Sequence, residues 1–377
     1  MRIRRDPSKD QSAVLTQPLV ISIDAMGGDH GPPVVVPAVV RAISLLPEDV
    51  RFLLHGDQAV IAAALARQPA AARRIEIQPA ERVIAMDEKP AQALRRGKGT
   101  SMWNAVEALR EGRAAAAVSA GNTGALMAIS RLILRMTADL ERPALVTSIP
   151  TLGTTFLDVG ANIDCDAERL VEFAIMGEAY HRAAHGVAKP TVGLLNVGSE
   201  EMKGHEEVRE AHRVLREGKI DLDYRGFVEG DDITRGAVDV IVTDGFTGNV
   251  TLKAMEGAAR FMGAELRSAL FSGPLSGLGA ILARSALMKF RERMSPTPAA
   301  PLLGLNGIVL KAHGGASTRD FTMAVQLAVD LARSDFSAEI ERNMRRLPDA
   351  LAEPAPAGAI EANGVTPHGA APQGARE

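Results

Sequence analysis

The sequence feature that most constrains the fold is a repeated transition from a short apolar run to the start of a helix. It occurs in AAAAVSAGNTGALMAI, TTFLDVGANID, TVGLLNVGSEEMKGHE and VDVIVTDGFTGNVTLKAMEG. In each, Gly, Asn, Ser or Thr follows a strand-like run and precedes a helical pattern. The free backbone N–H groups of a helix start favour anions. If these starts gather at one edge of a sheet, they form a pocket for phosphate or for a developing oxyanion.

Strand and helix patterns alternate along the chain. The expected strands are 19–24, 51–55, 115–119, 144–149, 155–159, 191–196, 238–243 and 307–311, and the expected helices are 34–46, 91–111, 123–136, 167–184, 204–217, 248–270 and 320–346. Such alternation predicts an α/β fold, a three-layer α/β/α Rossmann-like sheet with helices on both faces. Sheets of this kind bind ligands at the carboxyl ends of their strands.

Composition narrows the function classes. The 377 residues carry a formal net charge of -3, contain one cysteine and are only 3% aromatic. We therefore expect no nucleic-acid partner, no internal disulfide and a core of aliphatic side chains. The scattered histidines predict no metal site. The basic start lacks the apolar core of a signal peptide, and no run has the roughly 18 apolar residues of a spanning helix, so we expect a cytoplasmic protein.

The chain divides by composition into three parts. Residues 1–17 are polar and predict a flexible extension, and residues 349–377 are rich in Ala, Pro and Gly and predict a disordered tail. The body between them, 18–348, shows no composition break and predicts one domain. Within it, 268–296 joins a Gly/Pro-rich apolar loop to a basic, apolar helix.

Two interpretations of segment 268–296 stay open. One is a helical hairpin buried in a dimer interface. The other is a peripheral membrane contact through Leu275, Leu278, Ile281 and Leu282, with basic side chains meeting anionic head groups. Both hold if a dimer carries the loop at its tip.

Common nucleotide and hydrolase signatures are absent. RRGKGTS fails as a phosphate-binding P-loop because Gly99 follows Lys98 where Ser or Thr is required. No GxGxxG opens a strand–helix unit, and no HExxH or nucleophile elbow occurs.

Three polar segments lie in the first half of the body. IDAMGGDHGP contains Asp24, Gly27, Gly28 and Asp29 and predicts either a turn with a helix cap or a phosphate-facing wall. SAGNTGA contains Gly121, Asn122, Thr123 and Gly124 and predicts either a helix cap or a phosphate cradle. Arg95, Arg96 and Lys98 form either a solvated face or a docking patch for an acidic partner.

Three further segments lie in the second half. NVGSEEMKGHE places Ser199 and Lys203 after a strand, where the lysine is either a surface ion-pair partner or a fixed cation. TDGFTGN contains Asp244, Thr247, Gly248 and Asn249, whose amide can donate beside the helix start. His313 in KAHGGAS is either a structural hydrogen-bonder or a donor to an oxyanion.

Taken together, these motifs resemble those of the bacterial phosphate acyltransferases. IDAMGGDHGP, SAGNTGALMA, RPAL, LDVGAN, LLNVGSEEMKGHE, TDGFTGNV and LLGLNGIVLKAHGGAS follow one another in the order of that family, over about 19–345. The resemblance implies a fold similar to phosphotransacetylase and isopropylmalate dehydrogenase. It also implies reversible transfer of a fatty acyl group from acyl-acyl-carrier-protein to inorganic phosphate for phospholipid biosynthesis, without a cofactor.

The resemblance also implies partners and a location. It implies a homodimer loosely associated with the membrane, and a membrane glycerol-3-phosphate acyltransferase as the protein that receives the product. Asn162 in LDVGAN joins the substrate-binding candidates.

The residues themselves suit this chemistry because no activated Ser or Cys nucleophile is visible. Phosphate oxygen would then attack the thioester directly, with Lys203, Asn249 and His313 as the catalytic candidates. Three rivals stay open: a CoA-dependent phosphotransacetylase, a decarboxylating dehydrogenase of similar fold, and a non-catalytic acyl-carrier or lipid-binding regulator.

Overall fold

A computed structural model describes residues 18–137, 140–149, 153–218, 220–294, 297, 299–334 and 340. The predicted extension 1–17 and tail 349–377 lie outside the described residues. The strands are β1 (Leu19–Asp24), β2 (Val50–Gly56), β3 (Ile75–Pro79), β4 (Ala116–Ser119), β5 (Ala144–Ser148), β6 (Thr155–Leu157), β7 (Thr191–Leu195), β8 (Asp223–Val228), β9 (Val240–Val242), β10 (Ala299–Leu303) and β11 (Ile308–Ala312).

The helices alternate with these strands, as the sequence predicts. They are α1 (Pro32–Ile43), α2 (Gln58–Leu65), α3 (Pro69–Ala72), α4 (Pro90–Arg96), α5 (Ser101–Arg110), α6 (Thr123–Leu134), α7 (Ala167–His185), α8 (Glu206–Glu217), α9 (Gly245–Leu270), α10 (Pro274–Leu282), α11 (Arg284–Arg293) and α12 (Thr318–Ala332). A short 3₁₀ turn covers Asp232–Thr234. The predicted helix 320–346 is described only through its first part.

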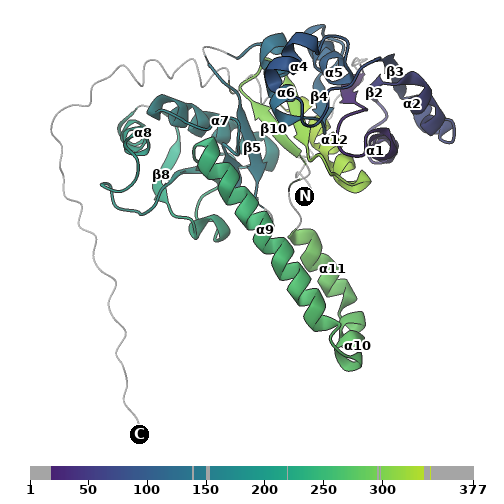
Figure 1. The fold of residues 1–377 in the computed structure, drawn as a ribbon. Coiled ribbons are helices and arrows are strands. Elements are labelled where there is room, and N and C mark those ends of the chain that lie inside the picture. The colour runs from purple at the N-terminus through teal and green to yellow at the C-terminus, as the bar shows by residue number, and fades with distance from the viewer. Residues whose placement is uncertain are drawn as a thin grey trace, which may run out of the picture.

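One mixed sheet runs through the body in the order β3-β2-β1-β4-β11-β10-β5-β6-β9-β7-β8 (Figure 1). Helices cover both faces, which confirms the three-layer α/β/α prediction. Strand residues alternate between two apolar clusters. Leu310, for example, belongs to the cluster that packs against α12, and Val309 belongs to the cluster that packs against α6.

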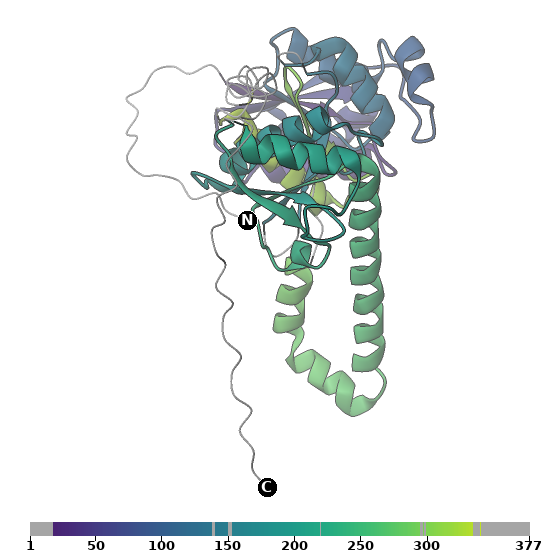
Figure 2. The ribbon, with the colours of Figure 1, turned by 90° about the vertical axis from the view of Figure 1, so that its left-hand side faces the viewer.

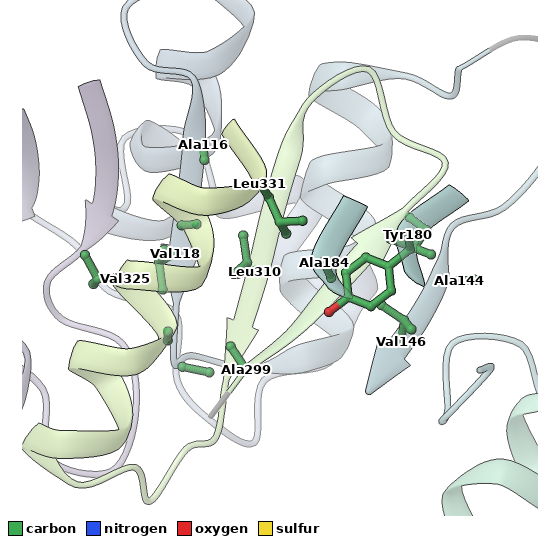
Figure 3. Close-up of a cluster of buried hydrophobic side chains, with 14 of the residues drawn as sticks. Ala116, Val118, Ala144, Val146, Tyr180, Ala184, Ala299, Leu310, Val325 and Leu331 are labelled. Carbon is green, nitrogen blue, oxygen red and sulfur yellow. The ribbon is translucent and has the colours of Figure 1, made fainter. Parts of the chain in front are cut away.

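The core consists mainly of aliphatic side chains. Figure 3 shows Val325 and Leu331 of α12 over Val118 and Leu310, and Tyr180 of α7 beside Val146. These residues are almost completely buried. The aliphatic core predicted from composition is therefore present.

Strand direction reverses at three successive pairings in the middle of the sheet, β11–β10, β10–β5 and β5–β6. β1, β2, β4 and β11 run parallel, β10 is antiparallel to both β11 and β5, and β5 is antiparallel to β6. β6, β9, β7 and β8 then run parallel to one another. The strands of the second half therefore run opposite to those of the first half.

A helical arm projects from the body. α9 leaves the end of β9, and α10 and α11 return toward the body, as the green ribbon in Figures 1 and 2 shows. Within the predicted segment 268–296, the Gly/Pro-rich apolar part contains a helix, α10, which joins α9 to α11 at the far end of the arm. No helix in the described part of the chain is long and apolar enough to cross a membrane.

Candidate active site

The predicted helix-start loops form two clusters. The first loop cluster follows β1, β4 and β11 and consists of residues 24–29, 119–124 and 313–315. The second loop cluster follows β6, β7 and β9 and consists of residues 158–162, 196–204 and 244–249. Between described residues, no hydrogen bond or ion pair links one cluster to the other.

The expectation that all these starts share one sheet edge is wrong. Three antiparallel pairings, β11–β10, β10–β5 and β5–β6, leave the strands of the second half running opposite to those of the first, so the carboxyl ends of the two sets of strands point to opposite edges of the sheet. Apolar periodicity marks where a strand lies but not which way it runs.

The helices of the two clusters share one face of the sheet. Ala125 and Leu126 in the first turn of α6 belong to the same apolar cluster that Leu252 and Met255 of α9 pack against. This common packing places both helices on the same face of the sheet.

Glycines let the three segments of the first loop cluster touch. Gly28 has φ of 91°, and a Cβ there would lie 2.9 Å from the carbonyl oxygen of Gly314 and 3.0 Å from Cβ of Ala120. The N–H of Asp29 donates to that same Gly314 oxygen at 2.9 Å. The glycines of this cluster therefore bring backbone against backbone, which larger residues would prevent.

Asp24 organises the floor of this cluster. Its buried carboxylate accepts from Ser119 Oγ at 2.6 Å and from the Met26 N–H at 3.3 Å, and Ser119 Oγ accepts from the Gly121 N–H at 3.0 Å. Burial raises the pKa of Asp24 despite these hydrogen bonds. The contacts favour a structural role for Asp24 beneath the loops.

Asn122 has two structural tasks. Its Oδ1 accepts from the Ala125 N–H at 3.0 Å and caps α6, while Nδ2 donates to the carbonyl oxygens of Met86 at 2.8 Å and Glu88 at 2.9 Å. It thus ties the 84–90 segment to the first loop cluster. Thr123 and Gly124 begin α6, and their N–H groups have no acceptor within the helix, as at any helix start.

His313 lies exposed at the rim of the same cluster. Its Nδ1 accepts from the Gly315 N–H at 3.1 Å, so in this arrangement the proton of the neutral ring is on Nε2. Nε2–H is then available to a phosphate oxygen or an oxyanion.

Asp158 organises the second loop cluster. Its buried carboxylate accepts from the N–H groups of Leu145, Ala161 and Asn162, and also from Asn162 Nδ2 at 2.8 Å. Burial raises its pKa. Nδ2 of Asn162 also donates to the Pro143 carbonyl at 2.9 Å, so this predicted substrate-binding side chain is occupied in bracing the loop.

The start of α9 is locked in the same way. Asp244 accepts from the N–H of Thr247 at 2.8 Å and from its hydroxyl at 2.7 Å, and the Gly248 N–H donates to the Asp244 carbonyl at 2.9 Å. These bonds favour helix capping as the role of Asp244 and Thr247. Asn249 lies beside Gly160, and its amide has no hydrogen-bond partner among the described residues.

Lys203 sits in an exposed loop. Its Nζ pairs with Glu200 Oε1 at 2.7 Å, and that hydrogen bond raises its pKa. Ser199 is exposed in the same loop. The predicted docking residues Arg95 and Arg96 at the end of α4, and Lys98 beyond it, are exposed.

Two buried residues of the loop clusters were not predicted as site residues. Lys311 is the penultimate residue of β11, beneath the first loop cluster, and Asp158 follows β6. Both lie inside motifs that carried the family resemblance, but only burial distinguishes them from surface charges. Within the described residues, no group of His, Cys, Asp and Glu is arranged to hold a metal ion.

Comparison with known proteins gives consistent matches. Residues 19–339 match the family model described as "Fatty acid synthesis protein". The chain is 75% identical over 344 residues to a phosphate acyltransferase of Phenylobacterium zucineum, covering 91% of this chain and 98% of that one. It is 64% identical over 337 residues to a phosphate acyltransferase of Caulobacter vibrioides, covering 88% and 93%.

Solved structures match the fold. A phosphotransacetylase from Streptococcus pyogenes superposes with a TM-score of 0.56 at 17% identity, covering 83% of this chain and 94% of that one. The EutD phosphotransacetylase from Staphylococcus aureus gives 0.54 at 15% identity, with the same coverage. The fold similarity to phosphotransacetylase predicted from the motifs is confirmed.

Proposed function

The chain belongs to the fatty acid synthesis protein family that contains the phosphate acyltransferases, and from this premise we propose how its two loop clusters divide the reaction. The chain is an acyltransferase that transfers an acyl group to phosphate. The first loop cluster holds the phosphate, and the second holds the acyl donor by its carbonyl group.

One observation carries this mechanism: among the described residues of the two loop clusters and their surroundings, no protein nucleophile is ready to accept the acyl group. Burial raises the pKa of the Cys165 thiol to about 12, so its thiolate is scarce at neutral pH. The Ser119 hydroxyl already donates to Asp24. A reaction without an acyl-enzyme needs a substrate nucleophile, and phosphate oxygen supplies it.

In the proposed step, a phosphate oxygen attacks the thioester carbonyl carbon and forms a tetrahedral oxyanion. The C–S bond then breaks, the thiolate of the donor leaves, and acyl-phosphate remains. His313 Nε2–H and the free N–H groups of Thr123 and Gly124 orient the phosphate. Lys203 and the Asn249 amide stabilise the oxyanion, and loss of one such donor costs about 10²–10³ in rate.

We propose a fatty acyl group on acyl-carrier protein as the donor, with the product used in phospholipid biosynthesis. A carrier thioester suits an enzyme of fatty acid synthesis, and an acidic carrier suits the exposed cations Arg95, Arg96 and Lys98. Acyl-phosphate is a reactive mixed anhydride, so we further propose transfer to a membrane glycerol-3-phosphate acyltransferase.

We also propose a cytoplasmic homodimer that touches the membrane through the arm. Leu275, Leu278, Ile281 and Leu282 are exposed on α10, at the far end of α9 and α11. Exposed apolar side chains such as Phe261 and Phe290 lie further along the arm, where a second arm can cover them.

The test is incubation of the purified full chain with palmitoyl-acyl-carrier-protein and labelled inorganic phosphate. Labelled acyl-phosphate and free carrier thiol should appear in equal amounts. Acetyl-CoA in place of the carrier tests for a phosphotransacetylase, and carrier binding without release of thiol would indicate a non-catalytic regulator. Lys203→Ala and Asn249→Ala should each lower kcat, and near-normal turnover would remove that residue from the mechanism.

A further inference from the structure

Lys311 is a buried cation at the carboxyl end of β11, directly beneath the first loop cluster. Its side chain is 9% exposed. Nζ donates to the Ala120 carbonyl at 3.3 Å and to the Ala312 carbonyl. The ammonium therefore braces the loop that leads into α6, and it has a third N–H to donate.

The ammonium lacks an ion-pair partner. No carboxylate among the described residues pairs with Lys311, although Asp24 and Asp29 are near enough to raise its pKa. Burial outweighs them and lowers that pKa to about 8. Buried charges are normally paired, because an uncompensated charge in the protein interior is costly.

Arg169, the other buried Lys or Arg in the described region, differs from Lys311 because carboxylates neutralise its charge. Arg169 is 7% exposed and contacts the carboxylates of both Glu172 and Glu141. Lys311 is nearly as buried, at 9% exposed, yet it faces two carbonyl oxygens rather than a carboxylate. The contrast indicates that the counter-ion of Lys311 comes from outside the chain.

The neighbouring aspartates are poorly placed to be that counter-ion. The Asp24 carboxylate is engaged by Ser119 Oγ and the Met26 N–H, and its burial favours the protonated, neutral form. Asp29 is exposed, with its backbone tied to Gly314. An anion above the first loop cluster would neutralise the charge of Lys311 and accept hydrogen bonds from the free N–H groups at the start of α6.

We propose that Lys311 is the counter-charge of the phosphate site, so that inorganic phosphate binds above residues 120–124 and 313–315 with the Lys311 ammonium as its buried cation. This rests on the proposed function, and it names the residue that holds the attacking substrate. Lys203, exposed and paired with Glu200, then acts on the acyl donor.

The experiment compares Lys311→Gln with Lys311→Met in the full-length protein. Gln keeps N–H donors for the Ala120 and Ala312 carbonyls but removes the charge, whereas Met removes both. Lys189→Met is the matched control, because Lys189 is an exposed cation near β7 that pairs with Asp221. Two quantities are measured: the KM for phosphate against that for the acyl donor, and the rise in melting temperature with added inorganic phosphate.

Both Lys311 variants should raise the KM for phosphate at least 10-fold and lose most of the phosphate-induced thermal shift. The KM for the acyl donor should stay within about twofold, and Lys189→Met should match the wild type. If Lys311→Gln keeps the wild-type affinity for phosphate, Lys311 only braces the loop and the proposal is wrong. If Met does not fold, Gln alone decides.

The two proposals fail differently. A wild-type protein that makes no acyl-phosphate overturns the proposed function. A wild-type protein that makes it, with unchanged phosphate affinity in Lys311→Gln, overturns only the assignment of Lys311.

Discussion

At the scale of single residues, Gly248 shows how closely the second loop cluster is packed. A Cβ at this position would lie 1.9 Å from the carbonyl oxygen of Asp158. That oxygen belongs to the backbone, so it cannot rotate away as a flexible side chain would. The start of α9 and the 158–162 loop must therefore separate before any larger residue fits.

We expect Gly248→Ala to lower the free energy of unfolding by about 3 kcal/mol, the upper range for overpacking a core. Urea unfolding followed by circular dichroism measures this. Gly257→Ala is the control in the same helix, since a Cβ there meets nothing within 4 Å. It should be neutral or slightly stabilising because alanine favours helix. Equal effects of the two changes would contradict the packing argument.

Two buried histidines make stability depend on pH. His55 Nε2 lies 2.9 Å from Ser22 Oγ, and His181 Nδ1 lies 2.9 Å from Thr155 Oγ1. Burial lowers the pKa of each to about 4, from an ordinary value of 6.5. Below about pH 6.5 these two histidines therefore become protonated in the unfolded chain, whereas in the folded chain they stay neutral until the pH approaches 4.

Stability should fall as the pH drops from about 6.5 toward 4, by up to roughly 3 kcal/mol for each histidine. Buried Asp24 and Asp158 have raised pKa values and act in the opposite direction, so the comparison must be between variants. The urea midpoint of His55→Gln should drop less between pH 7.5 and pH 5 than that of the wild type. His30→Gln, at an exposed histidine, should show the same drop in urea midpoint as the wild type. If the midpoints of all three proteins fall equally between pH 7.5 and pH 5, burial of His55 is not a source of the pH dependence.

The sequence predicted the loops of the site better than the roles of their residues. Gly121, Thr123 and Gly124 lie at a helix start as the motif indicated, because turn and capping preferences are local. Lys311 was missed, since the same letter describes a buried and an exposed lysine and only the packed strands distinguish them. Asn122 was expected either to cap a helix or to contact phosphate, and it caps α6, but its bonds to Met86 and Glu88 depend on a segment more than thirty residues away.

At the scale of elements, the strongly periodic helices and the buried strands were predicted with small errors at their ends. The expected helix 91–111 is instead two helices, because Gly97 ends α4 and Gly99 adopts φ of 84° before α5 begins. β3, β8 and β10 were missed. β3 and β8 lie at the sheet edges and are only partly buried, so they lack the continuous apolar signal of a central strand.

The arm carries the element-scale prediction. Leu275 and Leu282 are among the most exposed large apolar side chains described, at 87% and 80%. Replacing both with Ser should reduce sedimentation with vesicles of anionic phospholipid at least fivefold, because each removes apolar surface that would enter the bilayer. Leu45→Ser, an exposed leucine after α1, is the matched control. Unchanged sedimentation of the double variant would place membrane contact elsewhere.

At the scale of the whole molecule, the fold class followed from alternation of strands and helices, but the reversal between the two halves did not. It results from three antiparallel pairings, β11 with β10, β10 with β5 and β5 with β6. The β10–β5 pairing joins residues far apart in the chain, and a single sequence does not encode it as a local pattern. The family resemblance supplied the fold that periodicity alone left open.

The proposed homodimer is a whole-molecule property. We expect light scattering on a sizing column to give twice the mass of one chain. Phe261→Asp should shift it to a single chain, because it places a charge on an apolar surface that the partner would cover. Arg41→Asp, on α1 of the body, makes a larger charge change away from the arm and should stay dimeric. A wild-type monomer at micromolar concentration would end this proposal.

The narrow join between β10 and β5 has a mechanical consequence. Only two residue pairs, Leu302 with Leu145 and Leu303 with Ala144, register across it. This is the shortest ladder in the described sheet, and we expect the two halves to rotate most easily about it, which would change the distance between the two loop clusters. Substrate-driven closure about such a hinge should slow hydrogen exchange at these four amides when both substrates are bound, and leave the β1–β2 amides unchanged.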